Sequence, residues 1–153
     1  IRKRDPSVAS LRDVEAESLE SLLGDQDRHV ADRCRHVVGE NARVLAAVET
    51  HAEGNLTEFG RLMTASHESL RDLYDASHPA IDRLVATALE TPGVLGSRLT
   101  GAGWGGCTVT LCRNDAVSSF TNRMSEVFAE LGSPGSVLSP GPAAAAGIVE
   151  VAN

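Results

Sequence analysis

Lysine is almost absent from this sequence, since it occurs once, at Lys3, and every other cationic side chain is arginine or histidine. That absence excludes a Walker phosphate-binding loop, which needs a lysine directly after its glycines. It also excludes a protein-kinase active site, which needs a strand lysine downstream of the glycine-rich loop. A phosphate site in this chain would have to use other donors.

Several further shortages narrow the class of protein. The 14 Lys and Arg stand against 21 Asp and Glu, a formal net charge of −7, whereas nucleic-acid binders usually carry a basic surplus or stripe. No apolar run approaches the roughly 20 residues that span a bilayer, and the N-terminus lacks the apolar stretch of a signal peptide. We therefore expect neither a nucleic-acid nor a membrane partner. Because the chain begins with Ile1 rather than Met, we expect a processed product or a fragment.

Cysteine is also scarce. The three cysteines are Cys34, Cys107 and Cys112, an odd number without CxxC spacing. This pattern predicts reduced thiols in a cytoplasmic protein rather than a disulfide framework or a metal site.

The first half of the chain has the periodicity of helices. The 153 residues are 42% hydrophobic and 23% charged, which is ordinary for one globular domain. Apolar residues recur at three- and four-residue steps, and glycine or proline interrupts the pattern at short connections, which predicts antiparallel helices. The helical stretches are residues 19–23, 30–48, 56–73 and 79–89.

The pattern changes after Pro92. Residues 94–99 and 107–112 are predicted strands and 117–131 a helix closed by Gly132, while 137–138 and 148–151 are short strand candidates. The order predicts an α+β fold, with antiparallel helices followed by a small, mainly antiparallel sheet and a crossing helix. We expect a single domain over residues 1–153, with a lead-in segment at about 1–25, a helical part at 26–92 and a β-rich part at 93–153.

A glycine-rich segment joins the two predicted strands, because residues 101–106 hold four of the 14 glycines. Gly101, Gly103 and Gly106 satisfy GxGxxG, but a dinucleotide site needs a helix after the motif, and a strand follows here, so we reject that interpretation. Two interpretations remain: a tight hairpin whose glycines relieve strain, or a loop whose N–H groups hold an anion, typically phosphate. A hairpin needs only two loop residues, so the glycine density favours the phosphate loop.

Residues 97–109, which include Thr100-Gly101-Ala102-Gly103-Trp104-Gly105-Gly106, closely resemble the third conserved motif of the galactokinases. That family belongs to the GHMP group of small-molecule kinases. Trp104 stands where phenylalanine is usual, and Leu99 where methionine is usual. Three other segments resemble the same family in the same order: residues 35–44, 59–72 and 92–98. The resemblance runs from about Leu11 to the end and implies a C-terminal domain of the GHMP kinase type.

The resemblance implies what the whole enzyme does. It would transfer the γ-phosphate of Mg-ATP to the anomeric hydroxyl of galactose, giving galactose 1-phosphate. Residues 100–106 would form a loop for the ATP phosphates and the substrate. The sugar motif with the catalytic arginine, the main ATP loop, the catalytic aspartate and the Mg ligands are expected in a missing N-terminal domain. We therefore assign no catalytic residue and no metal site to this chain, and expect it to be inactive alone. Its expected partners are galactose, ATP and that domain.

Single residues near the loop each have two interpretations. Trp104 is expected to prop the loop by packing rather than to stack on a nucleotide. Arg98 would steer phosphate or, as is commoner, pair with an acid on the sheet surface. Gly103 is expected at the closest approach to the ligand, so that Gly103→Val would lower turnover more than stability. His29 and His36 share a helix face without other ligands nearby, which favours surface or packing roles.

Two alternatives to a galactokinase remain open from the sequence. One is an N-acetylgalactosamine kinase or another GHMP kinase, since the sugar pocket is expected mostly outside this chain. The other is a non-catalytic, galactokinase-like sugar sensor or interaction module.

His67 beside Ser66 does not suggest a nucleophilic pair, because adjacent helical residues do not face each other. Asp72 and Asp75 are expected on a solvated acidic face.

Overall fold

The computed structural model describes residues 1–132 and 134–140. Within these residues, five α-helices and two strands follow one another, with two short 3-10 turns: η1 (Leu11–Asp13), α1 (Ala16–Leu23), α2 (Arg28–Ala52), α3 (Leu56–Asp72), α4 (Pro79–Glu90), β1 (Val94–Thr100), β2 (Cys107–Cys112), η2 (Asn114–Ala116) and α5 (Val117–Glu130). The predicted helices and the two longer predicted strands are confirmed.

The short strand predicted at 137–138 is wrong. Residues 134–140 form neither helix nor strand. Two apolar residues between Gly135 and Ser139-Pro140 are too few to form a ladder, and Val137 instead packs against the core without pairing as a strand. The strand predicted at 148–151 lies outside the described residues.

Polar residues at the helix ends explain the bounds. Asp27 accepts a hydrogen bond from the main-chain N–H of His29 and begins α2, and Asn55 accepts one from Glu58 and begins α3. His78 caps α4, whose first residue, Pro79, needs no hydrogen-bond partner for its nitrogen. Gly24 ends α1 at φ +54°, a conformation that glycine adopts without strain.

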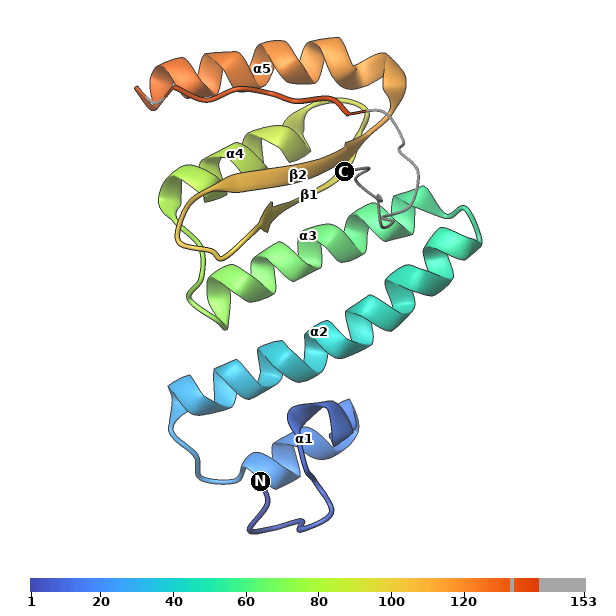
Figure 1. Ribbon diagram of the computed structural model, residues 1–153, viewed down its shortest axis with the longest axis vertical. Helices are drawn as coiled ribbons and strands as arrows, with labels where there is room; N and C mark the ends of the chain where they lie inside the picture. The colour runs from blue at the N-terminus through green and yellow to red at the C-terminus, as the bar shows by residue number, and fades with distance from the viewer. Residues whose placement is uncertain (133, 141–153) are drawn as a thin grey trace, which may run out of the picture.

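The elements are stacked in layers (Figure 1). From one end to the other come α1, α2, α3, the two-stranded sheet beside α4, and α5. The strands are antiparallel, with a register from Val94↔Cys112 to Thr100↔Cys107, so the turn between them is residues 101–106. Within the described residues, no helix combines the length and apolar composition that crossing a bilayer requires.

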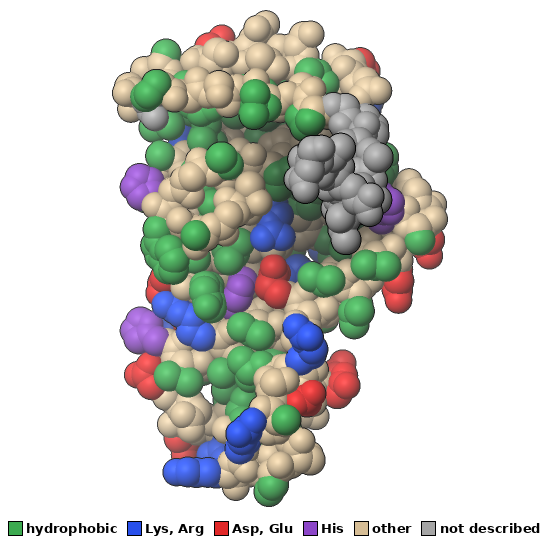
Figure 2. All heavy atoms as spheres, viewed as in Figure 1, with side chains coloured by type: hydrophobic (Ala, Val, Ile, Leu, Met, Phe, Trp, Pro, Cys, Tyr) green, Lys and Arg blue, Asp and Glu red, His purple; other side chains and the backbone are tan. Residues whose placement is uncertain are grey.

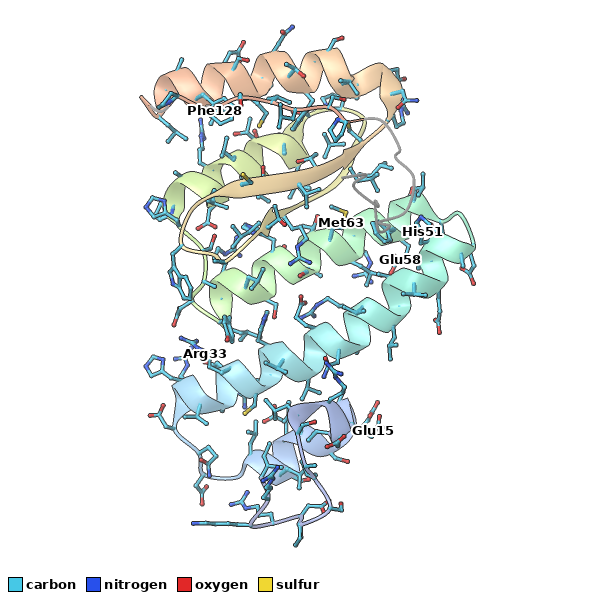
Figure 3. The ribbon with its side chains drawn as sticks, in the orientation of Figure 1. Glu15, Arg33, His51, Glu58, Met63 and Phe128 are labelled. Atoms are coloured by element: carbon cyan, nitrogen blue, oxygen red, sulfur yellow. The ribbon has the colours of Figure 1, made fainter. Side chains whose placement is uncertain are left out.

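Two separate apolar cores hold the layers together. The first lies between α4, α5 and β1 and includes Leu99 and Val127, with Phe128 of α5 packed against it (Figure 3). The second joins the N-terminal segment and α1 to the first half of α2, and includes Leu23 and Val38. Polar side chains occupy the level between α2 and α3, where Figure 2 shows charged and histidine side chains.

Helix α3 meets β1 at two glycines. A Cβ atom built on Gly60 would lie well inside 3.0 Å of the main-chain carbonyl of Leu95, and one built on Gly96 would meet the carbonyl of Gly60 in the same way. Real Cβ atoms do not come so close to main chain. The pair therefore lets helix and strand cross backbone to backbone, which fixes the strand that leads into the glycine turn.

Candidate functional site

The seven predicted loop residues come together in one turn at the open end of the hairpin. Thr100 closes β1 opposite Cys107, and residues 101–106 connect the strands. All four glycines of the turn have positive φ, from +92° at Gly103 to +139° at Gly105. Side chains with a Cβ rarely adopt these angles, so the glycine density follows from the conformation of the turn.

The turn has a packed side and an open side. A Cβ atom on Gly103 would lie 2.6 Å from the carbonyl oxygen of Ala76, in the connection between α3 and α4. Gly101 and Gly105 have no such neighbour within 4 Å among the described residues. The absence of a side chain at Gly103 thus allows close packing against Ala76. At Gly101 and Gly105 there is space for another group to approach the main chain. A substitution at Gly103 is therefore expected to reduce stability as well as any activity.

Trp104 ties the turn to the α3–α4 connection. Its main-chain N–H donates to the carbonyl of Ala76 at 2.7 Å, and its indole N–H donates to the carbonyl of Asp75 at 2.9 Å. The side chain is nonetheless 63% exposed. The indole therefore props the loop through its N–H group while much of its surface stays open.

Arg98 is the charged side chain nearest the turn along β1. It is half-buried, and its Nε donates to the carbonyl of Leu99 at 3.0 Å. Every other arginine from Arg28 onward forms an ion pair, whereas Arg98 forms none within the described part of the chain. An acid partner on the sheet surface, the commoner of the two interpretations, is thus not present among these residues.

His67 lies directly behind the strand end, whereas the sequence analysis considered it only as a neighbour of Ser66. It is 1% exposed, and its Nδ1 accepts the main-chain N–H of Leu99 at 3.4 Å. Its Nε2 lies 3.4 Å from Oδ1 of Asp82 without an aligned hydrogen bond. Burial lowers the pKa of His67, although the Asp82 carboxylate opposes the shift. No spacing signal identifies this contact, because Leu99 lies 32 residues away.

The level between α2 and α3 is a network of polar contacts. The buried ring of His36 lies with Nδ1 2.8 Å from Oγ of Ser69, and burial lowers the pKa of His36. Ser66 donates to Glu40 at 2.6 Å. Burial acts to raise the pKa of Glu40, but hydrogen bonds from Ser66 and Arg43 outweigh it, and the pKa is lowered. His36 is thus a packing residue, while His29 is exposed.

The two aspartates near the end of α3 are exposed, as expected, but each is paired. Asp72 accepts hydrogen bonds from Arg71. Asp75 pairs with Arg33 of α2 at 2.9 Å, an ion pair that joins distant parts of the chain. In the described ranges, no three His, Cys, Asp or Glu side chains lie close enough to hold a metal ion.

Known proteins share this arrangement. A family profile described as "GHMP kinases C terminal" matches residues 45–130. Galactokinase from Roseiflexus sp. (strain RS-1) is 43% identical over 123 residues, which is 80% of this chain and 32% of that protein. Galactokinase from Homo sapiens is 50% identical over 107 residues, 70% of this chain and 27% of that protein. The chain thus spans about a third of the length of these relatives.

A solved structure agrees with the sequence matches. The crystal structure of Lactococcus lactis galactokinase complexed with galactose superposes with a TM-score of 0.76 and 39% identity, covering 85% of this chain and 34% of that one. The fold and the sequence matches together are those of the C-terminal region in the GHMP kinase family. The chain belongs to the GHMP kinase family, and within it this region is galactokinase-like.

Proposed function

We propose that this chain is the C-terminal portion of a cytoplasmic galactokinase, which transfers the γ-phosphoryl group of ATP to the anomeric hydroxyl of galactose. The observation that carries the proposal is the match to Lactococcus lactis galactokinase complexed with galactose, at 39% identity over 85% of this chain. Because the chain spans about a third of its relatives, the activity belongs to a longer protein, and this portion alone is expected to be inactive.

The glycine turn is the part of this chain that would face the phosphates. Phosphoryl transfer depends mainly on positioning and on stabilising negative charge. Gly101 and Gly105 border open space, so an anionic group has room to reach the main-chain N–H groups of the turn, and the exposed Thr100 adds a hydroxyl. In sites of this kind, the loss of one donor costs roughly 2.7–4 kcal/mol. The described residues therefore fit the phosphates of ATP, whereas ligands for Mg²⁺ are expected in the N-terminal portion.

Arg98 supplies the positive charge that the turn itself lacks. Its guanidinium has no carboxylate partner in the described residues, although carboxylates pair with the other arginines of the helical and sheet region. An arginine can form two parallel hydrogen bonds with a phosphate, which adds direction as well as charge. We assign to Arg98 the role of an anion-binding residue at the edge of the loop.

An exposed apolar surface on α2 is where we expect the N-terminal portion to pack. Val38 is buried under the N-terminal segment, but Val44, Leu45 and Val48, two to three turns further along the helix, are 60%, 68% and 65% exposed. An apolar stripe on a helix normally packs against another element. We place the missing domain against these three residues, where it would complete the cover that α1 begins.

The first test is an assay of the full-length protein. The intact mass of the native product is expected to be well above that of 153 residues. ADP release is then measured with galactose, with N-acetylgalactosamine and without sugar. Galactose-dependent release supports the proposal. A preference for N-acetylgalactosamine contradicts the proposed substrate, and no sugar-dependent release from a folded protein contradicts the kinase.

A variant pair tests the role of Arg98. Arg98→Met keeps the aliphatic stem and removes the charge, so kcat is expected to fall about 100-fold. Arg83→Met is the matched control, because Arg83 pairs with Glu130 on the exposed side of α4 and α5, away from the turn. Equal activity of the two variants would contradict an anion-binding role for Arg98.

A further inference from the structure

Two residues hold an unusual backbone conformation, and they touch each other. Among the described residues, Asp75 at φ +52° and Trp104 at φ +56° are the non-glycine residues with positive φ. Such a conformation carries a strain that the surrounding structure must hold in place, and it is concentrated at functional sites. The indole of Trp104 donates to the carbonyl of Asp75, so the two strained positions support one contact between two loops.

The left-handed turn at Asp75 aims two consecutive carbonyls at the glycine turn. The carbonyl of Asp75 accepts the indole N–H, and the carbonyl of Ala76 accepts the main-chain N–H of Trp104. Gly103 rests against the same Ala76 carbonyl. On the left of Figure 1, the β1–β2 turn lies beside the α3–α4 connection, as these bonds require.

Arg33 of α2 holds the α3–α4 connection from the other side. It donates to the carbonyl of Leu73 at 2.6 Å and to Oδ2 of Asp75 at 2.9 Å. Its guanidinium also lies 5.4 Å from the centre of the Tyr74 ring. In Figure 3, Arg33 is labelled at the end of α2 that faces this connection. Arg33 thus donates hydrogen bonds to the connection at two places, Leu73 and the strained residue Asp75.

We propose that the α3–α4 connection is the positioning element of the glycine turn: Asp75, in its left-handed conformation, and Ala76 fix residues 103–104 through main-chain carbonyls, and Arg33 fixes Asp75. This inference rests on the proposed function, since the turn would be held ready for phosphate. Holding Gly103 and Trp104 leaves Gly101 and Gly105 presented to the open side. Donors fixed before the ligand arrives need no rearrangement during the reaction.

The backbone conformation of Asp75, rather than the charge of its side chain, is what positions the glycine turn. The side chains of Arg33 and Asp75 are 37% and 63% exposed, and exposed ion pairs contribute little. Glycine adopts a left-handed backbone freely, whereas a β-branched residue strongly resists it. Asp75→Gly removes the side chain and keeps the conformation, and Asp75→Val disfavours the conformation, so the two variants separate backbone from charge.

Trp104 reports on the turn directly, because it is the only tryptophan in the sequence. The fluorescence anisotropy of Trp104 is measured in the 153-residue chain, with circular dichroism to confirm folding. Asp75→Val is expected to lower the anisotropy as the turn is released, and Asp75→Gly to stay near the original value. The proposal is overturned if the anisotropy falls as far in Asp75→Gly as in Asp75→Val, or if Asp75→Val leaves the anisotropy unchanged.

Two additions keep the test decisive. If Asp75→Val does not fold, Arg33→Met replaces it, since it removes both bonds to the connection without forcing a new backbone; an unchanged anisotropy would then overturn the proposal. In the full-length protein, Asp75→Val is expected to lower kcat about 10–100-fold, with KM for galactose changed less than about twofold. The separate variant Asp75→Gly is expected to keep kcat near that of the original protein. A full-length protein without sugar-dependent ADP release refutes the proposed function, while the anisotropy still decides the positioning role.

Discussion

The crossing of α3 and β1 at Gly60 and Gly96 leads to a prediction with an unusual sign. Glycine is normally a poor residue inside a helix, and replacing it with alanine adds roughly 0.8–1.0 kcal/mol of stability. Gly60→Ala is expected to do the opposite. Its new Cβ atom would lie well inside 3.0 Å of the Leu95 carbonyl, so main chain must move on both sides of the crossing.

The magnitude follows from two opposing contributions. Forcing an extra methyl group into a well-packed site costs about 1–3 kcal/mol. The upper part of that range applies at Gly60, because the obstacle is main chain and not a side chain that can rotate away. After the gain in helix propensity, we expect a net loss of about 2 kcal/mol.

Gly39 of α2 provides the matched control. The nearest atom to a Cβ built there is a terminal nitrogen of the Arg43 side chain, at 3.1 Å, and a flexible side chain can move aside. Gly39→Ala is therefore expected to gain up to about 1 kcal/mol. For a chain of this size, a difference of about 3 kcal/mol corresponds to a Tm difference of roughly 6–12 °C.

The assay is urea unfolding of both variants and the original chain, followed by circular dichroism and by Trp104 fluorescence. Equal effects of Gly60→Ala and Gly39→Ala, in either direction, would refute the inference that helix and strand meet backbone to backbone.

Two further predictions concern the buried polar side chains of α2 and α3. Because burial lowers the pKa of His36 and His67 below 6.5, the unfolded chain binds protons first as the pH falls, so stability is expected to drop below about pH 6.5, by at most about 1.4 kcal/mol per pH unit for each histidine. Urea midpoints between pH 7.5 and 5 measure this, and His67→Gln should flatten the dependence; an unchanged slope would contradict it. Ser66→Ala removes the hydrogen bond to half-buried Glu40 and is expected to cost about 2 kcal/mol, whereas Ser125→Ala, on the exposed side of α5, should stay within about 0.5 kcal/mol in thermal unfolding.

Sequence patterns predicted the elements well because each one depends on neighbours in the chain. The apolar repeat of α4, the proline at its start and the glycine that ends α1 act over one or two helical turns. The strand predicted at 137–138 failed because Val137 packs against the core without strand pairing, while Leu138 is exposed, and composition does not separate such a segment from a strand.

The glycine density and the resemblance to galactokinases predicted the loop residues, but they did not predict the contacts that hold the loop. The anchor of Trp104 lies 29 residues earlier in the chain, and nothing local predicts that Asp75 takes a left-handed conformation. The lack of a carboxylate partner for Arg98 is likewise a property of the folded surface. Gly60 and Gly96 look ordinary in the sequence, and their close approach exists only after α3 and β1 meet.

The two apolar cores, separated by a polar level, also shape how the chain comes apart. The core under α5 and the core under α1 share no residue, so each layer is cohesive mainly with its neighbours, as in repeat proteins. Opening at the N-terminal end need not disturb the hairpin, and the free energy of local opening is graded along the stack. Arg33 of α2 bonds to the α3–α4 connection, and the contacts of His36 with Ser69 and of Glu40 with Ser66 also join α2 to α3. Unfolding of the outer layers therefore reaches the turn through these polar contacts.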